Sequence, residues 1–157
     1  MTSVYNHVGI RVSSIERSAA FYEAVLGAKV VLGPWPFRGA TARAAMDGEE
    51  RAGQVAVIGF GEGFIELFEL PGASGEPLAY VEQSLLHFAA TVDDVPAAVE
   101  RVRANGGSVV FEPTPVGSYL ASYVRDPDGT TFELLDAPFS SVVEAIRARL
   151  EAAAGPR

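Results

Sequence analysis

The strongest constraint on the fold is an internal repeat, because the chain carries one short pattern twice. Residues 6–15, NHVGIRVSSI, align position by position with residues 86–95, LHFAATVDDV, and the histidine falls at the same place in both. Residues 64–68, FIELF, align in the same way with residues 131–135, TFELL, and each carries a glutamate at its third position. The chain of 157 residues is therefore predicted to fold as two similar modules.

The first half of the chain has the pattern of a strand, a helix and further strands. Apolar and polar residues alternate over residues 6–12, which is typical of a strand. Ser13 and Glu16 have the spacing of a capping box, and apolar residues then recur at helical spacing until Gly27. The aromatic-rich residues 33–39 are predicted to form a loop over a pocket. The remaining predicted strands are residues 28–32, 40–46, 54–60 and 64–70.

The second half of the chain follows the same order. Asp93 and Asp94 are expected to cap a helix that ends near residues 105–107. The predicted strands are residues 86–92, 108–111, 120–124 and 131–135, and residues 140–154 form an amphipathic helix expected to pack on the outside or on a second subunit. The sequence thus predicts an α+β fold of two βαβββ modules with a C-terminal helix. The predicted boundaries are 1–71 for the first module, 72–84 for a linker, 85–138 for the second module, and 139–157 for the helix and tail.

Composition excludes several classes of function. The absence of cysteine rules out disulfides, thiolate nucleophiles and thiolate metal sites. The net charge of −8 argues against nucleic acid or an anionic membrane as the main partner, because binding to phosphates requires a basic surface. No apolar run approaches the ~20 residues of a membrane span, and the first residues lack the pattern of a signal peptide. A cytoplasmic location is therefore expected.

Glu133 is the carboxylate that most needs an explanation. It lies in an apolar strand that follows the turn Asp126-Pro127-Asp128-Gly129, in which proline and glycine favour a tight reversal. A buried carboxylate is paired, protonated or bound to a metal ion. The identity of its partner bears directly on the function of the chain.

The repeat supplies a candidate set of metal ligands. His7, Glu66, His87 and Glu133 occupy matched positions, and a pseudo-twofold packing of the modules would bring them into one ring. Imidazole and carboxylate suit a divalent ion such as Zn, Ni, Co, Mn or Fe(II). A lone histidine in a strand is usually structural, but the matched positions of both histidines favour ligation. Glu69 lies on the opposite strand face and is a poorer ligand.

These motifs resemble those of the vicinal oxygen chelate superfamily, which includes glyoxalases, bleomycin resistance proteins and extradiol dioxygenases. The resemblance covers nearly the whole chain. The motifs that carry it are HVGI at 7–10, SAAFY at 18–22, LG at 26–27, IEL at 65–67, HFA at 87–89, DPDG at 126–129 and FEL at 132–134.

The resemblance implies a curved mixed sheet around a metal ion, often in a homodimer, sometimes with modules exchanged between chains. His7, Glu66, His87 and Glu133 would be the four ligands. A complete set resembles the branch of lactoylglutathione lyase and methylmalonyl-CoA epimerase, which are metal-dependent lyases and isomerases. There the metal stabilises an enediolate of a small oxygenated substrate while a carboxylate transfers the proton. Glu133 would be the catalytic base, with Glu66 as the alternative.

Two other functions fit the same resemblance. One is an Fe(II) extradiol-type dioxygenase, although that branch leaves the Glu66 position empty. The other is an antibiotic- or ligand-sequestering protein of the bleomycin resistance type, although those members have lost the ligands.

Other polar and aromatic residues are candidates for lining a substrate pocket. Arg11 and Arg125 are candidates for binding a carboxylate or phosphate of the substrate. For arginines at strand ends, a surface or ion-pair role is the more common one. Four aromatic residues fit either an apolar pocket or the core, namely Trp35, Phe37, Phe60 and Tyr119.

Overall fold

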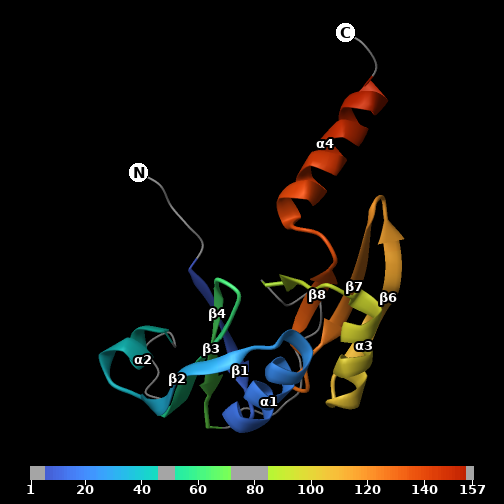
Figure 1. Cartoon of the computed structure of the whole chain (residues 1–157). Helices are drawn as coiled ribbons and strands as arrows, with labels where there is room; N and C mark the ends of the chain where they lie inside the picture. The colour runs from blue at the N-terminus through green and yellow to red at the C-terminus, as the bar shows by residue number, and fades with distance from the viewer. Residues whose placement is uncertain (1–5, 46–51, 72–84, 155–157) are drawn as a thin grey trace.

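The computed structural model describes residues 6–45, 52–71 and 85–154 and shows an α+β fold built from two modules (Figure 1). The first module consists of β1 (His7–Val12), α1 (Ile15–Leu26), β2 (Lys29–Phe37), α2 (Ala40–Ala45), β3 (Gly53–Phe60) and β4 (Gly63–Glu69). The second consists of β5 (Phe88–Thr91), α3 (Val95–Ala104), β6 (Ser108–Val116), β7 (Tyr119–Arg125) and β8 (Thr131–Leu135), followed by α4 (Phe139–Ala154). The predicted linker, 72–84, lies outside the described residues.

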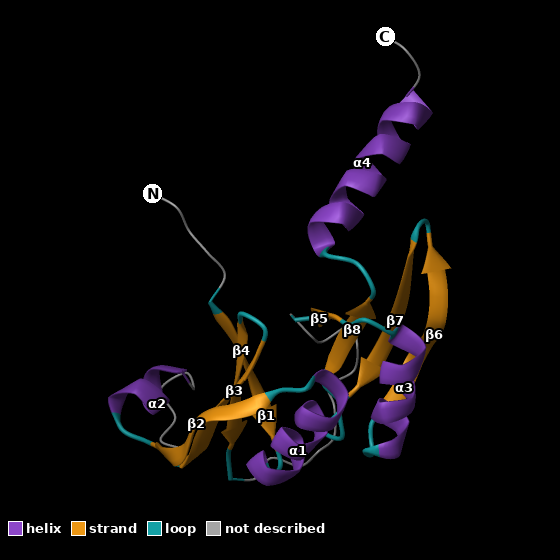
Figure 2. Cartoon of the chain, in the orientation of Figure 1, coloured by secondary structure: helices purple, strands orange, loops and turns teal. Residues whose placement is uncertain are grey.

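The two sheets have the same topology, which confirms the fold expected from the repeat. Each sheet is four-stranded, with the orders β1-β4-β3-β2 and β5-β8-β7-β6 (Figure 2). The first strand of each module pairs in parallel with the last, β1 with β4 and β5 with β8, and the other pairings are antiparallel. This pairing places β1, which begins with His7, beside β4, which carries Glu66. It likewise places β5, which directly follows His87, beside β8, which carries Glu133.

Three local predictions were wrong. Residues 33–37 continue β2 instead of forming a loop, because Trp35 pairs with Val55 after a shift in register. Residues 40–45 form α2 instead of a strand, in keeping with the high helix propensity of an alanine-rich segment. The N-cap of α1 is Ser14, whose side chain accepts a hydrogen bond from the Arg17 N–H, whereas Ser13 contacts the other module.

The two modules share one hydrophobic core, which lies around the helices. Phe21 and Tyr22 of α1 are buried against the second module, where their rings pack 6.1 and 5.9 Å from the ring of Phe132. Phe132 in turn stacks on Phe88 with a ring separation of 5.4 Å. Buried aliphatic residues of α3, including Val99, belong to the same cluster. Helix α1 therefore contributes to both modules and sets how they sit against each other.

The turn before β8 is locked by a buried carboxylate. Asp126 is 3% exposed, and its Oδ1 accepts hydrogen bonds from the N–H groups of Asp128 (2.9 Å) and Thr130 (2.8 Å). Its Oδ2 accepts a 2.8 Å hydrogen bond from the Tyr22 hydroxyl. Burial raises the pKa of Asp126, an effect that the Tyr22 hydrogen bond partly opposes, and burial together with the Asp126 charge raises the pKa of Tyr22. Gly129 closes the turn at a φ of 88°.

A second carboxylate of this turn fastens it to the start of α1. Asp128 Oδ1 accepts a 2.6 Å hydrogen bond from Arg17 Nη2, and its Oδ2 accepts a 3.2 Å bond from the Ser13 N–H. Burial by itself raises the pKa of Asp128, but the bonds from Ser13 and Arg17 outweigh it and the net shift is downward. The turn therefore joins the modules through both of its aspartates.

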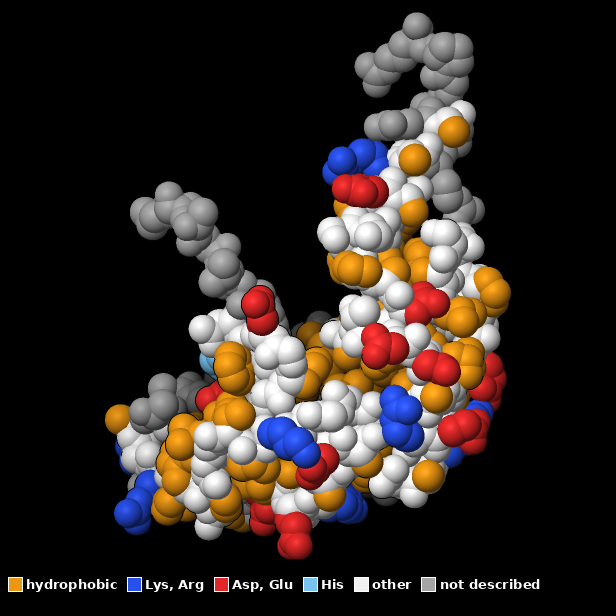
Figure 3. All heavy atoms as spheres, in the orientation of Figure 1, with side chains coloured by type: hydrophobic (Ala, Val, Ile, Leu, Met, Phe, Trp, Pro, Cys, Tyr) orange, Lys and Arg blue, Asp and Glu red, His pale blue; other side chains and the backbone are white. Residues whose placement is uncertain are grey.

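Helix α4 extends away from the two modules (Figure 1). Val142 is buried, whereas hydrophobic side chains spaced three or four residues apart along α4 are exposed. Figure 3 shows hydrophobic atoms on the surface of this helix. These exposed residues are Phe139, Val143, Ile146 and Leu150. The expectation that this helix packs on the outside or on a second subunit stays a prediction. None of the helices in the described residues is long and apolar enough to span a membrane.

Replacing Tyr22 by phenylalanine tests the junction between the modules. The Tyr22→Phe variant removes the hydroxyl that donates to Asp126 and leaves a buried carboxylate oxygen without that donor. We expect the free energy of unfolding to fall by about 2 kcal/mol at pH 7, as measured by urea denaturation. Tyr119→Phe, on β7 and away from this contact, is the matched control. Equal stabilities of Tyr22→Phe and the wild type would contradict the interpretation.

The Arg17–Asp128 contact predicts a dependence of stability on pH. Because the pKa of Asp128 is lowered in the folded state, its contribution is present above the unfolded pKa and is lost as pH falls through the folded pKa. We expect Arg17→Met to lower the free energy of unfolding by about 0.5–1 kcal/mol at pH 7. The difference from the wild type should shrink as the pH is lowered from 7 toward 2, because protonation of Asp128 removes the charge that pairs with Arg17. Arg38→Met, at an exposed position, is the control; an equal loss at both pH values would rule out the Asp128 charge as the cause.

Candidate functional site

The first candidate pair is formed by neighbouring strands of the first module. His7 begins β1, and Glu66 of β4 lies in register with Gly9, two residues further along β1. The Nε2 atom of His7 is 3.2 Å from Oε2 of Glu66. A Cβ at Gly9 would lie 2.9 Å from the ring of Phe68 and 3.8 Å from Glu66 Oε2. Because Gly9 has no side chain, space remains for the Glu66 carboxylate to approach the His7 imidazole.

Asn6 orients the imidazole of this first pair. Its Oδ1 atom lies 2.6 Å from Nδ1 of His7. Asn6 Oδ1 can only accept a hydrogen bond, so the contact places a proton on Nδ1 and leaves Nε2 as the ring nitrogen that faces Glu66. A histidine that ligates a metal is commonly held in this way, by a hydrogen bond from its other ring nitrogen.

The second module repeats this arrangement. His87 directly precedes β5, and Glu133 of β8 lies in register with Ala89, which takes the place of Gly9 in the repeat. His87 Nε2 is 3.6 Å from Glu133 Oε2. The ring of Tyr123 packs edge-on against the His87 ring with a centroid distance of 5.1 Å. Glu133 is 9% exposed, so the carboxylate is buried as its apolar neighbours predicted.

A pocket of about 450 Å³ opens beside the second pair. Its lining includes both polar and apolar side chains but no aspartate or glutamate. The apolar side chains of this lining are partly exposed. The lining residues are Leu86, His87, Val110, Phe111, Tyr123, Arg125 and Thr131.

The two pairs do not meet within one chain. In residues 6–45, 52–71 and 85–154 no group of three or more histidine, aspartate or glutamate side chains is placed to hold a metal ion. Each module therefore offers one imidazole nitrogen and one carboxylate, which is half of a usual ligand set. The donor types themselves, imidazole and carboxylate, fit a divalent ion.

Several residues of the site were not expected from the sequence. Asn6 orients His7, and Tyr123 and Phe111 line the second half-site. The alternation of strand residues carries a signal for Tyr123, since it lies in register with Glu133 on the neighbouring strand. Asn6 carries no such signal, because its contact depends on one rotamer at the start of β1.

Of the other candidate residues from the sequence, only Arg125 lies in the lining of the pocket beside the second pair. Arg125 lines the pocket, whereas Arg11 is exposed on β1 in register with Phe68. Phe37 packs on Phe68 with a ring distance of 4.9 Å. None of the four aromatic residues proposed from the sequence is part of the lining of this pocket.

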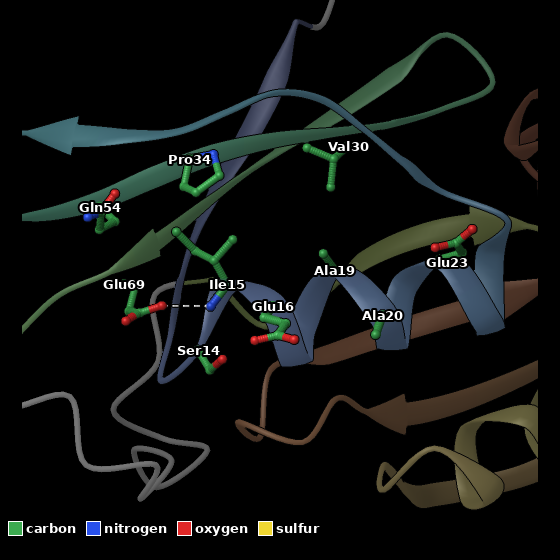
Figure 4. A pocket seen from close by; sticks show the side chains of 10 residues that line it. All are labelled: Ser14, Ile15, Glu16, Ala19, Ala20, Glu23, Val30, Pro34, Gln54 and Glu69. Atoms are coloured by element: carbon green, nitrogen blue, oxygen red, sulfur yellow. Dashed lines mark hydrogen bonds between the residues drawn. The ribbon is translucent and has the colours of Figure 1, made fainter.

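A second cavity, of about 610 Å³, lies on the helix side of the first module and is shown in Figure 4. There Glu69 Oε2 accepts a 2.8 Å hydrogen bond from the N–H of Ile15, marked by the dashed line in the figure. Glu69 thus accepts a hydrogen bond from the start of α1 and faces away from the His7–Glu66 pair. Its predicted exclusion from the ligand set agrees with this position.

A family model described as Glyoxalase/Bleomycin resistance protein/Dioxygenase superfamily matches residues 4–134. The chain is 34% identical over 137 residues to lactoylglutathione lyase of Salmonella typhimurium, covering 83% of this chain and 90% of that protein. It is 36% identical over 132 residues to a lactoylglutathione lyase of Arabidopsis thaliana, covering 82% of this chain and 42% of that protein.

Solved structures show the same fold. The structure of a glyoxalase family protein from Bacillus cereus superposes with a TM-score of 0.71 at 22% sequence identity. The match covers 83% of this chain and 91% of that one. Helix α4 begins beyond the last residue matched by the family model.

Proposed function

Because the chain belongs to the glyoxalase/bleomycin resistance protein/dioxygenase superfamily, we propose that it is a divalent-metal-dependent lyase or isomerase of the glyoxalase type. The observation that carries the proposal is the pair of matched His–Glu contacts, 3.2 Å and 3.6 Å long, at equivalent positions of the two modules. A protein that only sequesters a ligand has no need of both pairs.

The complete metal site is formed between two copies of the chain. His7 and Glu66 of one copy and His87 and Glu133 of the other supply the four ligands. This arrangement is supported by the separation of the two pairs within one chain. Exposed apolar side chains around both pairs also support it, because a facing module would cover them. They are Leu32, Phe64, Leu86 and Phe111.

The reaction is a proton transfer between adjacent carbon atoms of the substrate. A divalent ion bound at this site would acidify the C–H beside two neighbouring substrate oxygens by stabilising the enediolate. Glu133 accepts that proton and returns it to the adjacent carbon, so the substrate is isomerised without gain or loss of atoms. Glu133 is favoured over Glu66 because it is more deeply buried, with a side-chain exposure of 12% against 29%. Exclusion of water limits loss of the proton to solvent.

The substrate class is a small molecule that presents two neighbouring oxygens. The names of the relatives make the hemithioacetal of methylglyoxal and glutathione the first compound to assay. Hemithioacetals formed with smaller thiols belong in the same panel, because Arg125 is the one arginine or lysine among the residues that line the pocket beside His87.

Replacing Glu133 by glutamine separates the role of the base from that of a ligand. We expect Glu133→Gln to lower kcat by about 10²–10⁴-fold, because the amide cannot accept the proton. Glu66→Gln is the matched variant and should lose metal affinity with a smaller loss of kcat at saturating metal. The readouts are metal content by elemental analysis and incorporation of deuterium from D₂O into the product by NMR. Full activity of Glu133→Gln with its metal retained would exclude Glu133 as the base.

A mixed dimer tests whether the site spans two copies. One variant combines His7→Ala with Glu66→Gln, the other His87→Ala with Glu133→Gln, and each is expected to be inactive alone. The dimer with one chain of each kind contains one intact site and one with all four ligands replaced. We expect it to regain about half of the wild-type activity per dimer and to bind about one metal ion.

The two variants carry different affinity tags so that the mixed dimer can be purified by successive steps. If the four ligands came from one chain, the mixed dimer would stay inactive and bind no metal. Failure to form a dimer at all would also contradict the arrangement.

A further inference from the structure

Helix α4 projects from the two modules and has little contact with them (Figure 1). It spans 16 residues, and Val142 is the one buried side chain among the α4 side chains that the structure describes. A helix of this length is only marginally stable by itself in water, because most helical stability in proteins comes from the packing of an apolar face. The exposed hydrophobic side chains of α4 therefore call for a partner surface.

The spacing of these side chains indicates that the partner is a helix. They follow one another at intervals of four, three and four residues, which is the spacing of the a and d positions in a coiled coil. Such a seam is narrower than the apolar stripe with which a helix covers a core. The residues of this α4 seam are Phe139, Val143, Ile146 and Leu150.

The α4 of a second copy is the helix that fits the α4 seam. Among the described residues of α1, α2 and α3, no large hydrophobic side chain is exposed. Elsewhere in the described chain such side chains lie in strands or next to them, for example Leu32 on β2 and Phe111 on β6. Two copies related by a twofold axis present the same patch to each other, so a seam of this kind can pair with itself.

The place of α4 in the chain makes it continuous with the interface proposed for the metal site. Only residues 136–138 separate α4 from β8, the strand that carries Glu133. A seam of four side chains buries less than the roughly 1,200 Å² of a stable interface. Pairing of α4 therefore adds to the contact between facing modules and does not replace it.

We propose that α4 packs along α4 of a second copy through the α4 seam. The pairing removes the seam from water and links the two copies beside the strands that carry Glu133. That this dimer is the one that completes the metal site rests on the proposed function, whereas the pairing of the helices is measured without substrate or turnover.

The chain contains no cysteine, so one engineered cysteine reports on α4 alone. Ile146→Cys lies in the α4 seam, and Ala148→Cys, two residues further along, lies on the opposite side of the helix. Both full-length variants are treated, at low protein concentration, with a short bismaleimide that joins two thiols. We expect at least about 10-fold more covalent dimer from Ile146→Cys, because a paired seam raises the effective concentration of the two thiols. Equal yields from the two variants would overturn the proposal.

A charge placed in the α4 seam tests its contribution to self-association. Ile146 is 46% exposed in the single chain, so Ile146→Asp leaves the core of the modules intact, which circular dichroism checks. We expect its dimer dissociation constant, measured by sedimentation equilibrium, to rise at least about 10-fold, because pairing would desolvate the carboxylate. Ala148→Asp, on the opposite side, should keep the wild-type value. A wild-type dissociation constant for Ile146→Asp would contradict the pairing.

Mixing Ile146→Cys with Val31→Cys tests whether α4 packs instead on the exposed part of β2. A cross-link between these two variants that exceeds the cross-link of Ile146→Cys with itself would assign the α4 seam to β2 and overturn the proposal. A dimer that persists without an α4 cross-link would overturn the pairing alone and leave the two-copy metal site standing. A protein that is monomeric throughout would contradict both.

Discussion

The hydrogen bond between Tyr22 and Asp126 joins the two modules at a point where both groups are buried, and the geometry of the second half-site depends on it. Tyr22 belongs to α1 of the first module, and Asp126 begins the turn that leads into β8. The carboxylate also holds the turn closed through two backbone N–H groups. Because β8 starts directly after this turn, the same contact that holds the modules together places Glu133 opposite Ala89.

The packing of the helices explains why each module carries an open half-site. Helices α1 and α3 belong to the shared core, so the faces of the sheets that they cover are closed. The two His–Glu pairs are separate in the chain, and exposed apolar residues such as Phe64 and Phe111 lie near them. Glu69 shows the contrast within one strand, since it bonds to the start of α1 while Glu66 approaches His7. One face of each sheet thus packs in the shared core, and the other face carries a His–Glu pair available for binding.

The charge distribution fits binding of a small anion only at a local site. The chain as a whole carries a net charge of −8, which disfavours large polyanions. The pocket beside the second His–Glu pair is lined by Arg125 and by no aspartate or glutamate, so it is a local exception to this acidic composition.

Much of the fold followed from local patterns. The strand at 131–135 was predicted with the bounds of β8, Gly27 was predicted to end α1, and Asp94 was predicted to cap α3. Two of the three errors fall where tertiary contacts override local preference. Pairing with β3 holds residues 33–37 in β2. The N–H of Ser13 donates a hydrogen bond to Asp128, and Ser13 does not cap α1.

The sequence by itself determined the repeat and, through the alternation of strand residues, the side of the sheet on which each candidate ligand lies. These properties depend on covalent geometry and on neighbours within a few residues. Only the tertiary structure decided that His7 meets Glu66 and His87 meets Glu133 while the two pairs stay apart. It also left the Nε atom of Arg125 buried without a hydrogen-bond partner among the described residues. Both outcomes depend on how α1 packs between the modules, and no local pattern encodes the relative placement of two units joined by long-range contacts.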